Sequence, residues 1–539
     1  MNETVTVAEA FAERLAAHGV ARIFGLPGGG SSLDVIAACA ARGIPFVLSR
    51  TESGAVMMAG ATAELSGAPG VALTTKGPGV ANGANGVAYA MLDRAPVLLV
   101  TDGFTPAQTA YVTHQVFDQA AMVAPVTKRH GRLEGAEPVA EIDALIETAL
   151  APRRGPVHVE LTGAAARRRI AAPAAGRAPA APALAGDVEA LRARIAAARR
   201  PVVVVGLEGC RPAAAAAIRR LCGELGCAAL TTYKAKGVIA EDDPAYAGIF
   251  TGGAAEAPCV SSADLIVLAG LDPVELILQP WPYDLPVVEL SAAPHPVHYV
   301  APAVSVHGPI EQIVAALGAM PRAAGWSESE IAGHRDSLRG LLAYPSSGNL
   351  LSPQEVVQAA ARRAAADRAA MPRIAVDAGA HMFSANTFWP CAAPGDILIS
   401  NGLATMAYAL PAGIAAALHD PGRGAVAFTG DGGLLMCLGE LATAVQYGAA
   451  LTVIVFNDGS LSLIDIKQQS RGLPSEGVRW ERTDFAAVAR GMGLQAWRAD
   501  DAGSLDTALA QAYAADGPTL VDAWIDPRGY GAQLKASRG

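Results

Sequence analysis

Short apolar runs alternate with helical patterns along nearly the whole chain. Continuous apolar runs of four to eight residues are typical of strands that are buried on both faces of a parallel sheet. Their alternation with helical segments predicts βαβ units and an α/β fold. The clearest runs lie at residues 71–75, 96–100, 202–205, 264–268, 425–428 and 451–456.

Two stretches interrupt this pattern and predict linkers. Residues 170–186 are an Ala/Pro run without amphipathic period, and residues 317–353 hold one candidate helix between the breaks GWSESE and AYPSSGN. The chain is thereby divided into three domains, at residues 1–170, 187–320 and 350–539. We expect each domain to contain a mainly parallel sheet flanked by helices.

Composition and charge narrow the class of protein. The net charge is −9 and the basic residues are dispersed, which excludes a nucleic-acid-binding footprint. The first residues lack the basic and apolar regions of a signal peptide. The longest uncharged window, residues 397–418, contains Ser400, Asn401 and Pro411, so no membrane span is expected. Seven cysteines without CxxC spacing indicate a reducing compartment, and we expect a cytoplasmic protein.

The stretch from Gly430 to Ser460 carries the clearest chemistry. A GDGG turn opens it, and Asn457-Asp458 closes it directly after the apolar run 451–456. Two carboxylates suit Mg2+, which prefers oxygen ligands. Glycines let backbone N–H groups approach a diphosphate. A GDG turn alone would be weak evidence, because such turns also occur in ordinary hairpins.

The combination of GDG with a closing ND resembles the cofactor motif of the thiamine-diphosphate (ThDP) enzymes. The resemblance implies that ThDP and Mg2+ are the cofactors. It implies Asp431, Asp458 and the backbone carbonyl of Ser460 as metal ligands. The diphosphate would then lie against Gly430, Gly432 and Gly433. Asp458 departs from the Asn that is commonest at the closing position, although Asp also ligates Mg2+.

Motifs of the first domain resemble the pyrimidine-binding domain of the acetolactate synthase branch. They are FGLPGGG at residues 24–30, SRTESGA at 49–55 and TKGPGVAN at 75–82. The resemblance implies that Glu52 bonds N1' of the cofactor's aminopyrimidine and favours the imino tautomer that takes the C2 proton. Its neighbours, Thr51 and Ser53, differ from the branch's usual His-Glu-Gln. From the residues alone, Glu52 could also be a helix-terminal acid that complements the helix dipole.

A polar loop, THQVFD at residues 113–118, occupies the position of that branch's Phe-Gln-Glu. Gln115 matches the Gln, whereas His114 replaces the Phe. A His can transfer protons near neutral pH, and a Gln can hold a carbonyl or carboxylate of the substrate. We therefore take both as candidate catalytic residues. The alternative is a solvated loop without a role in the reaction.

In the third domain, residues 400–411 read SNGLATMAYALP and resemble the family's GLGTMGYGLP. The resemblance implies that Met406 is the wedge that bends the cofactor, a proximity effect, and that its N–H and the Ala404 carbonyl bond the pyrimidine. A Met in an apolar run is otherwise core. Ala404 and Ala407 replace two glycines. Gly379 and His381 match part of a Gly-Gln-His-Gln segment that contacts the diphosphate.

The residue six positions beyond Asp458 bears on the reaction. Pyruvate-decarboxylase-like relatives carry an acid there, whereas this chain has Ile464, with Asp465 one position away. The resemblance therefore predicts an enzyme that decarboxylates a 2-oxo acid and transfers the resulting enamine to a second carbonyl. Asp465 keeps open a 2-oxo-acid decarboxylase that releases an aldehyde. A non-catalytic scaffold protein is the third class, and the retention of Glu52, Asp431 and Asp458 argues against it.

The middle domain does not match the GxGxxG fingerprint of dinucleotide binding, because residues 206–209 break its spacing. Residues 231–237 and 270–275 resemble the family's central domain, which holds FAD in anabolic acetolactate synthases and is empty in many relatives. No residue set decides for FAD, and we do not expect it. The resemblance implies a homodimer or homotetramer with small-molecule substrates.

Overall fold

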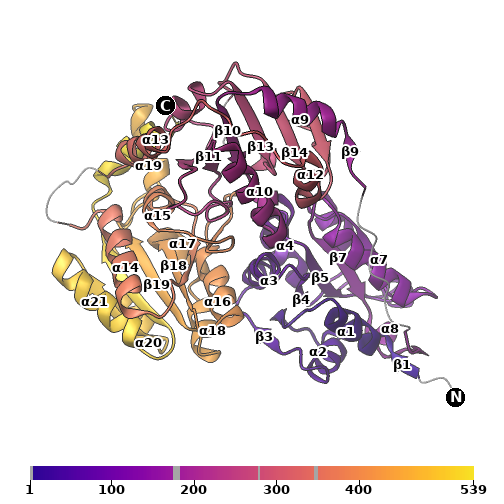
Figure 1. Ribbon diagram of the computed structural model, residues 1–539. Coiled ribbons are helices and arrows are strands. Elements are labelled where there is room, and N and C mark those ends of the chain that lie inside the picture. Colours follow the sequence, from indigo (N-terminus) through magenta and orange to yellow (C-terminus); the bar gives the residue numbers. More distant parts are fainter. Residues whose placement is uncertain (1–3, 174–182, 277–279, 345–349, 539) are drawn as a thin grey trace.

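The computed structural model describes residues 4–173, 183–276, 280–344 and 350–538, and it contains three large sheets with helices on their faces (Figure 1). The predicted α/β fold with three mainly parallel sheets is confirmed. The exact domain boundaries stay a prediction. Parts of both predicted linkers, residues 174–182 and 345–349, lie outside the described residues, and α13 (Glu328–Leu341) is the helix expected between the breaks.

The first sheet has six parallel strands in the order β3-β2-β4-β5-β7-β6. A short antiparallel pair, β1 (Thr4–Thr6) with β8 (Arg169–Ala171), lies apart from it. The strands of the sheet are β2 (Ile23–Leu26), β3 (Phe46–Leu48), β4 (Gly70–Thr74), β5 (Val97–Asp102), β6 (His130–Arg132) and β7 (Val157–Leu161). The main helices are α1 (Val7–Ala17), α2 (Ser31–Ala40), α3 (Glu52–Ser66), α4 (Pro78–Leu92) and α7 (Pro138–Leu150).

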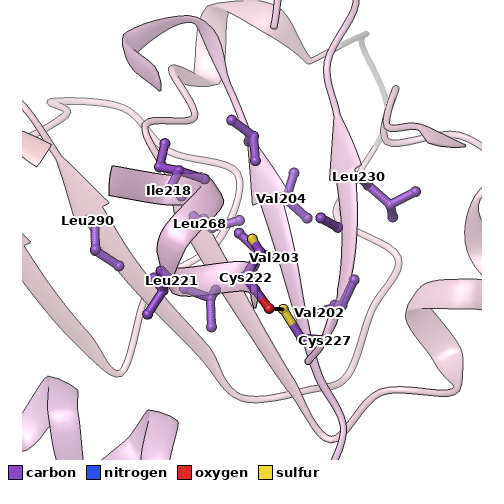
Figure 2. Packing of buried hydrophobic residues seen from close by; sticks show 14 of the residues in the cluster. Val202, Val203, Val204, Ile218, Leu221, Cys222, Cys227, Leu230, Leu268 and Leu290 are labelled. Carbon is purple, nitrogen blue, oxygen red and sulfur yellow. Dashed lines mark hydrogen bonds between the residues drawn. The ribbon is translucent and has the colours of Figure 1, made fainter. Parts of the chain in front are cut away.

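The second sheet is parallel except for β9 at its edge, in the order β12-β11-β10-β13-β14-β15-β9. One of its inner strands is β10, whose valines pack under α10 beside Leu268 and Leu290 (Figure 2). The strands are β9 (Ala185–Gly186), β10 (Pro201–Val205), β11 (Ala228–Thr231), β12 (Tyr246–Ile249), β13 (Leu265–Ala269), β14 (Val287–Ser291) and β15 (Val304–His307). The main helices are α9 (Val188–Ala197), α10 (Pro212–Leu225) and α12 (Ile310–Leu317).

The third sheet has six parallel strands in the order β17-β16-β18-β19-β21-β20. The chain reverses direction across the sheet between β16 and β18, and ligands bind at such switch points beyond the carboxyl ends of the strands. The strands are β16 (Arg373–Val376), β17 (Ile397–Ile399), β18 (Ala425–Gly430), β19 (Leu451–Asn457), β20 (Gln495–Ala499) and β21 (Thr519–Trp524). The helices are α14 (Pro353–Asp367), α15 (Met382–Phe388), α16 (Ala409–His419), α17 (Asp431–Cys437), α18 (Glu440–Gln446), α19 (Ser462–Ser470), α20 (Phe485–Gly491), α21 (Ala502–Ala514) and α22 (Tyr530–Arg538).

Helices α3 and α16 join the first and third sheets into one core (Figure 1). Both helices are rich in alanine, so their backbones approach closely. The predicted apolar runs form β4, β5, β10, β13, β18 and β19, all of them buried. In the described part of the chain, no helix combines the length and the apolar character that a membrane crossing requires.

One buried lysine links all three sheets. Lys234, from the loop after β11, is 7 % exposed and donates to Glu64 at 2.9 Å and to Asp93 at 3.0 Å in the first domain. It also donates to the Ile399 carbonyl of β17 at 3.3 Å. Asp93 in turn accepts from the backbone N–H of Asn401 at 2.8 Å. Buried charges of this kind require partners on several sides, and the three domains supply them jointly.

Candidate active site

The predicted residues of the third domain lie in the loops that follow β16, β18 and β19. Asp377 follows β16, Gly430 ends β18 and Asp458 follows β19. Because these strands are parallel neighbours, their carboxyl ends meet at one edge of the sheet. The edge brings together residues that the sequence separates by about eighty positions.

Asp431 and Asp458 form the acidic part of this site. Asp431 is 2 % exposed and accepts from the backbone N–H groups of Gly459 at 2.7 Å and Gly432 at 2.9 Å. Burial, with the nearby Asp458 charge, raises the pKa of Asp431 to about 7. Asp458 accepts from the Ser462 hydroxyl at 2.5 Å, and burial raises its pKa to about 6. A divalent cation would neutralise two carboxylates that disfavour one another's charge.

Glycines beside these carboxylates allow neighbouring side chains to pack close to the backbone. A Cβ on Gly433 would lie 2.2 Å from an oxygen of Asp377, so no larger residue fits there. A Cβ on Gly432 would meet Leu461, Trp480 and Met406 at 3.0 to 3.4 Å. Met406 therefore borders the GDGG turn. The space that a side chain at Gly432 or Gly433 would fill is taken by these neighbouring side chains, so both positions favour glycine.

His381 lies over the end of β18. It is 3 % exposed, its ring stacks on Phe456 at 5.0 Å, and burial lowers its pKa to about 4, so it is neutral at pH 7. A Cβ on Gly379 would lie 2.7 Å from this ring, and one on Gly430 would lie 3.4 Å from Nδ1. The buried Nε2 has no hydrogen-bond partner among the described residues. Gly379, His381 and Gly430 thus lie together, while their contact with a diphosphate stays a prediction.

Asp377 organises the loop that carries Met406, although no sequence motif singles it out. It is fully buried and accepts from the N–H groups of Ala407 at 3.1 Å and Tyr408 at 3.0 Å. Burial raises its pKa to about 6. Its place directly after a buried strand was the available signal. Ala404 (φ +52°) and Ala407 (φ +67°), the two alanines at glycine positions, both adopt the left-handed conformation that glycine favours.

Glu52 begins α3 and is 9 % exposed, as expected of an acid between an apolar strand and an alanine-rich helix. Glu440 of α18, likewise not singled out by any motif, accepts from the N–H groups of Arg50 at 3.0 Å and Thr51 at 2.9 Å and so fixes the helix start. Among the residues that the structure describes, no hydrogen bond or ion pair joins the Glu52 carboxyl to the Asp431 edge.

His114 and Gln115 lie on the exposed rim of the first domain. Gln115 has φ +61° and packs beside Gly77, whose Cβ would lie 2.9 Å from that of Gln115. Within the described ranges, neither side chain forms a hydrogen bond or ion pair with the third domain. The structure of one chain therefore does not bring these two candidates to the carboxylates.

Helix α19 carries Ile464 and Asp465, the two positions that bear on the type of reaction. Ile464 is 45 % exposed. Asp465 is buried and receives two hydrogen bonds from Arg479, at 2.7 and 3.0 Å. Desolvation opposes the charge of Asp465, but the bonds from Ser475 and Arg479 outweigh it and hold the pKa below its usual range. Asp465 is therefore an ion-pair partner at neutral pH.

Comparison with known protein families agrees with this geometry. The thiamine pyrophosphate enzyme N-terminal TPP binding domain matches residues 5–122, the central domain matches residues 188–317, and the C-terminal TPP binding domain matches residues 377–523. The chain belongs to the ThDP-dependent enzymes. It resembles the acetolactate synthases within them.

Three relatives of this ThDP enzyme align over nearly its whole length. An acetolactate synthase of Bacillus subtilis is 28 % identical over 96 % of this chain and 93 % of that protein. A catabolic acetolactate synthase of Raoultella terrigena is 29 % identical over 97 % and 95 %. A protein of Pseudomonas aeruginosa named a probable 2-ketoarginine decarboxylase is 30 % identical over 96 % and 94 %.

The residues at the Asp431 edge fit a metal-bound diphosphate. The oxygen donor set suits Mg2+, and the glycines place no side chain of their own between the backbone and a bound group. Two buried polar atoms, His381 Nε2 and Ser460 Oγ, lack partners among the described residues, whereas buried polar groups are nearly always bonded. Trp480 Nε1 is a third such atom in this part of the ThDP enzyme.

Proposed function

We propose that this ThDP enzyme requires Mg2+, decarboxylates a 2-oxo acid and joins the remaining acyl group to a second carbonyl compound, as an acetolactate synthase does. The observation that carries the proposal is the lack of a free acid at two positions of α19. Ile464 stands where decarboxylases of this family carry an acid, and Asp465 is engaged by Arg479. Neither residue offers a carboxylic acid proton that would end the reaction as a free aldehyde.

The cofactor would be held by the loops at the edge of the third sheet. Asp431, Asp458 and the Ser460 carbonyl ligate Mg2+ in this proposal, and the raised pKa values of the two carboxyls support it. The backbone of the GDGG turn (Gly430, Gly432, Gly433) would face the diphosphate, together with Gly379 and His381. Met406 and the Ala404 carbonyl would bond and support the pyrimidine.

When bound, ThDP supplies a carbon nucleophile for the 2-oxo acid and an electron sink for the loss of CO2. Side chains of the protein would prepare the bound cofactor for this reaction. Glu52 would hold a proton on its carboxyl oxygen for the pyrimidine N1', with Glu440 fixing the backbone at its helix start. Leu461 and Trp480 form an apolar wall beside Gly432 that excludes water from the carboxylates.

A homodimer or homotetramer in the cytoplasm is part of the proposal. The family resemblance implies that Glu52 of one chain lies against the diphosphate-binding domain of another chain. Large apolar side chains are exposed on both halves of the chain, and exposed apolar groups of this size favour an interface. They include Tyr111 (75 % exposed) on the first domain and Leu435 (43 %) and Met436 (58 %) on α17.

A 2-oxo-acid decarboxylase that releases an aldehyde is the second candidate. The relative named a probable 2-ketoarginine decarboxylase favours it. His114 would then be the proton donor, delivered by a loop whose side chains are exposed in one chain.

The test measures CO2 release by the purified protein with Mg2+ and ThDP across a panel of 2-oxo acids. Each acid is supplied with and without an aldehyde or a second 2-oxo acid, and products are identified. A joined product whose yield rises with acceptor supports the carboligase. Free aldehyde at a rate indifferent to acceptor supports the decarboxylase. Release from no acid would refute both.

A further inference from the structure

The segment after α19 returns to the loop that carries Asp458. Ser460 and Arg479 form an antiparallel bridge, Leu461 N–H donates to the Val478 carbonyl at 2.8 Å, and Trp480 N–H donates to the Gly459 carbonyl at 2.9 Å. A Cβ on Gly459 would lie 2.6 Å from the Trp480 carbonyl oxygen. Trp480 is therefore held in fixed register with the proposed metal loop.

Contacts on either side secure this returning segment. Arg479 donates twice to Asp465 at the start of α19, and the Ser475 hydroxyl donates to the other oxygen of Asp465. Arg482 donates to the Ile525 carbonyl at 2.8 Å. These contacts, together with the pairing to Gly459, hold the backbone on both sides of Trp480 and give its ring a firm support.

The Trp480 ring ends against the GDGG turn. Its Cη2, the Met406 methyl and the Leu461 methyl lie within 3.0 to 3.4 Å of the point that a Cβ on Gly432 would occupy. Its Nε1–H is buried and has no acceptor in the described part of the chain. Indole N–H groups find a partner when they are buried. The acceptor must come from something other than these residues.

We propose that the Trp480 indole N–H donates a hydrogen bond to the diphosphate end of the bound Mg–ThDP. The cofactor motif names no such residue, and the inference rests on the proposed Mg–ThDP site. In this proposal a diphosphate oxygen is the missing acceptor of the buried N–H, and a bond to a charged acceptor is stronger than a neutral one. Trp480 is then a binding residue of the cofactor as well as part of its wall.

The test is Trp480→Phe, which removes the N–H and keeps an aromatic wall. Calorimetry measures the Kd of Mg–ThDP and, separately, of Mg–pyrophosphate. We expect both Kd values to rise about tenfold, the effect of losing one hydrogen bond to a charged group. Trp497→Phe, on β20 at the edge of the sheet, is the matched control and should leave both Kd values unchanged.

Unchanged Kd values in Trp480→Phe would overturn the inference while leaving the proposed function intact. A loss confined to Mg–ThDP would also overturn it, because the N–H would then face another part of the cofactor. An equal loss of affinity in Trp497→Phe would show that the effect comes from a general loosening of the domain and would overturn the inference. Failure of the unsubstituted protein to bind Mg–ThDP would refute the proposed function and the inference together.

Discussion

The Asp431 carboxylate accepts a hydrogen bond from the backbone N–H of Gly459 at 2.7 Å. The bond ties the turn after β18 to the loop after β19, so the two halves of the proposed metal site hold each other in place. The neighbouring Asp458 charge raises the free energy of this arrangement, because it favours protonation of Asp431.

Asp431→Asn tests the metal site. The substitution keeps one acceptor but removes a charge and one of the two backbone-bonded oxygens, so we expect Mg2+ affinity in the presence of ThDP to fall about 100-fold. Calorimetric titration with Mg2+ measures it. Asp420→Asn, a surface acid paired with Arg373, is the control. Wild-type affinity in Asp431→Asn would contradict the assignment.

Glu52→Gln tests the proton donor. Gln has nearly the same shape but carries no ionisable proton, so we expect turnover to fall about 100-fold or more. Mg–ThDP affinity should stay within a few-fold, because the Glu52 side chain is not part of the proposed diphosphate site. Glu355→Gln, at the N-terminal cap of α14, should keep full activity. Full activity in Glu52→Gln would refute the mechanism.

Ala407→Gly should stabilise the protein. Ala407 has φ +67°, which strains any residue with a Cβ, and the gain outweighs the extra chain entropy of glycine in the unfolded state. We expect the free energy of unfolding to rise by about 1 kcal/mol in chemical denaturation. Ala415→Gly, in the interior of α16, should lower it by about 1 kcal/mol. A loss of stability in Ala407→Gly would show that the left-handed backbone is not strained.

Glu275→Gln predicts a change in the pH dependence of stability. Desolvation is the largest cause that raises the pKa of buried Glu275 to about 8, and bonds from Thr232 and Leu207 only partly offset it. The folded state therefore holds a proton that the unfolded state loses near pH 4.5. The stability from this group is fully present below pH 4.5 and is lost as pH rises towards 8. The melting temperature of Glu275→Gln should fall less over this range than that of the wild type. Parallel curves would show that Glu275 is ionised in the folded protein.

The sequence was sufficient where signals are local. Continuous apolar runs predict β18 and β19, and the residues that end these strands predict the meeting of Asp431 with Asp458 at one edge. Burial of Glu52 follows from its place between an apolar strand and an alanine-rich helix.

Long-range contacts could not be predicted in this way. Glu440 binds the backbone of Thr51 across nearly four hundred positions, and Trp480 reaches Gly432 only because its segment pairs with Gly459. Neither residue lies in a recognisable spacing. The exposed state of His114 and Gln115 also could not be read from a polar loop, because a loop's orientation depends on what covers it.

Lys234 constrains how this chain can change. Its charge is paired with Glu64 and Asp93 in another domain, so replacement of Lys234 leaves two buried carboxyls without their cation. These positions must therefore vary together in evolution. A chimaera that exchanges the central domain with a relative should succeed only when the donor brings the same lysine or the recipient's two acids are exchanged with it. The buried cluster of Lys234, Glu64 and Asp93 thus couples the first and central domains, so we expect these two domains to be exchanged together.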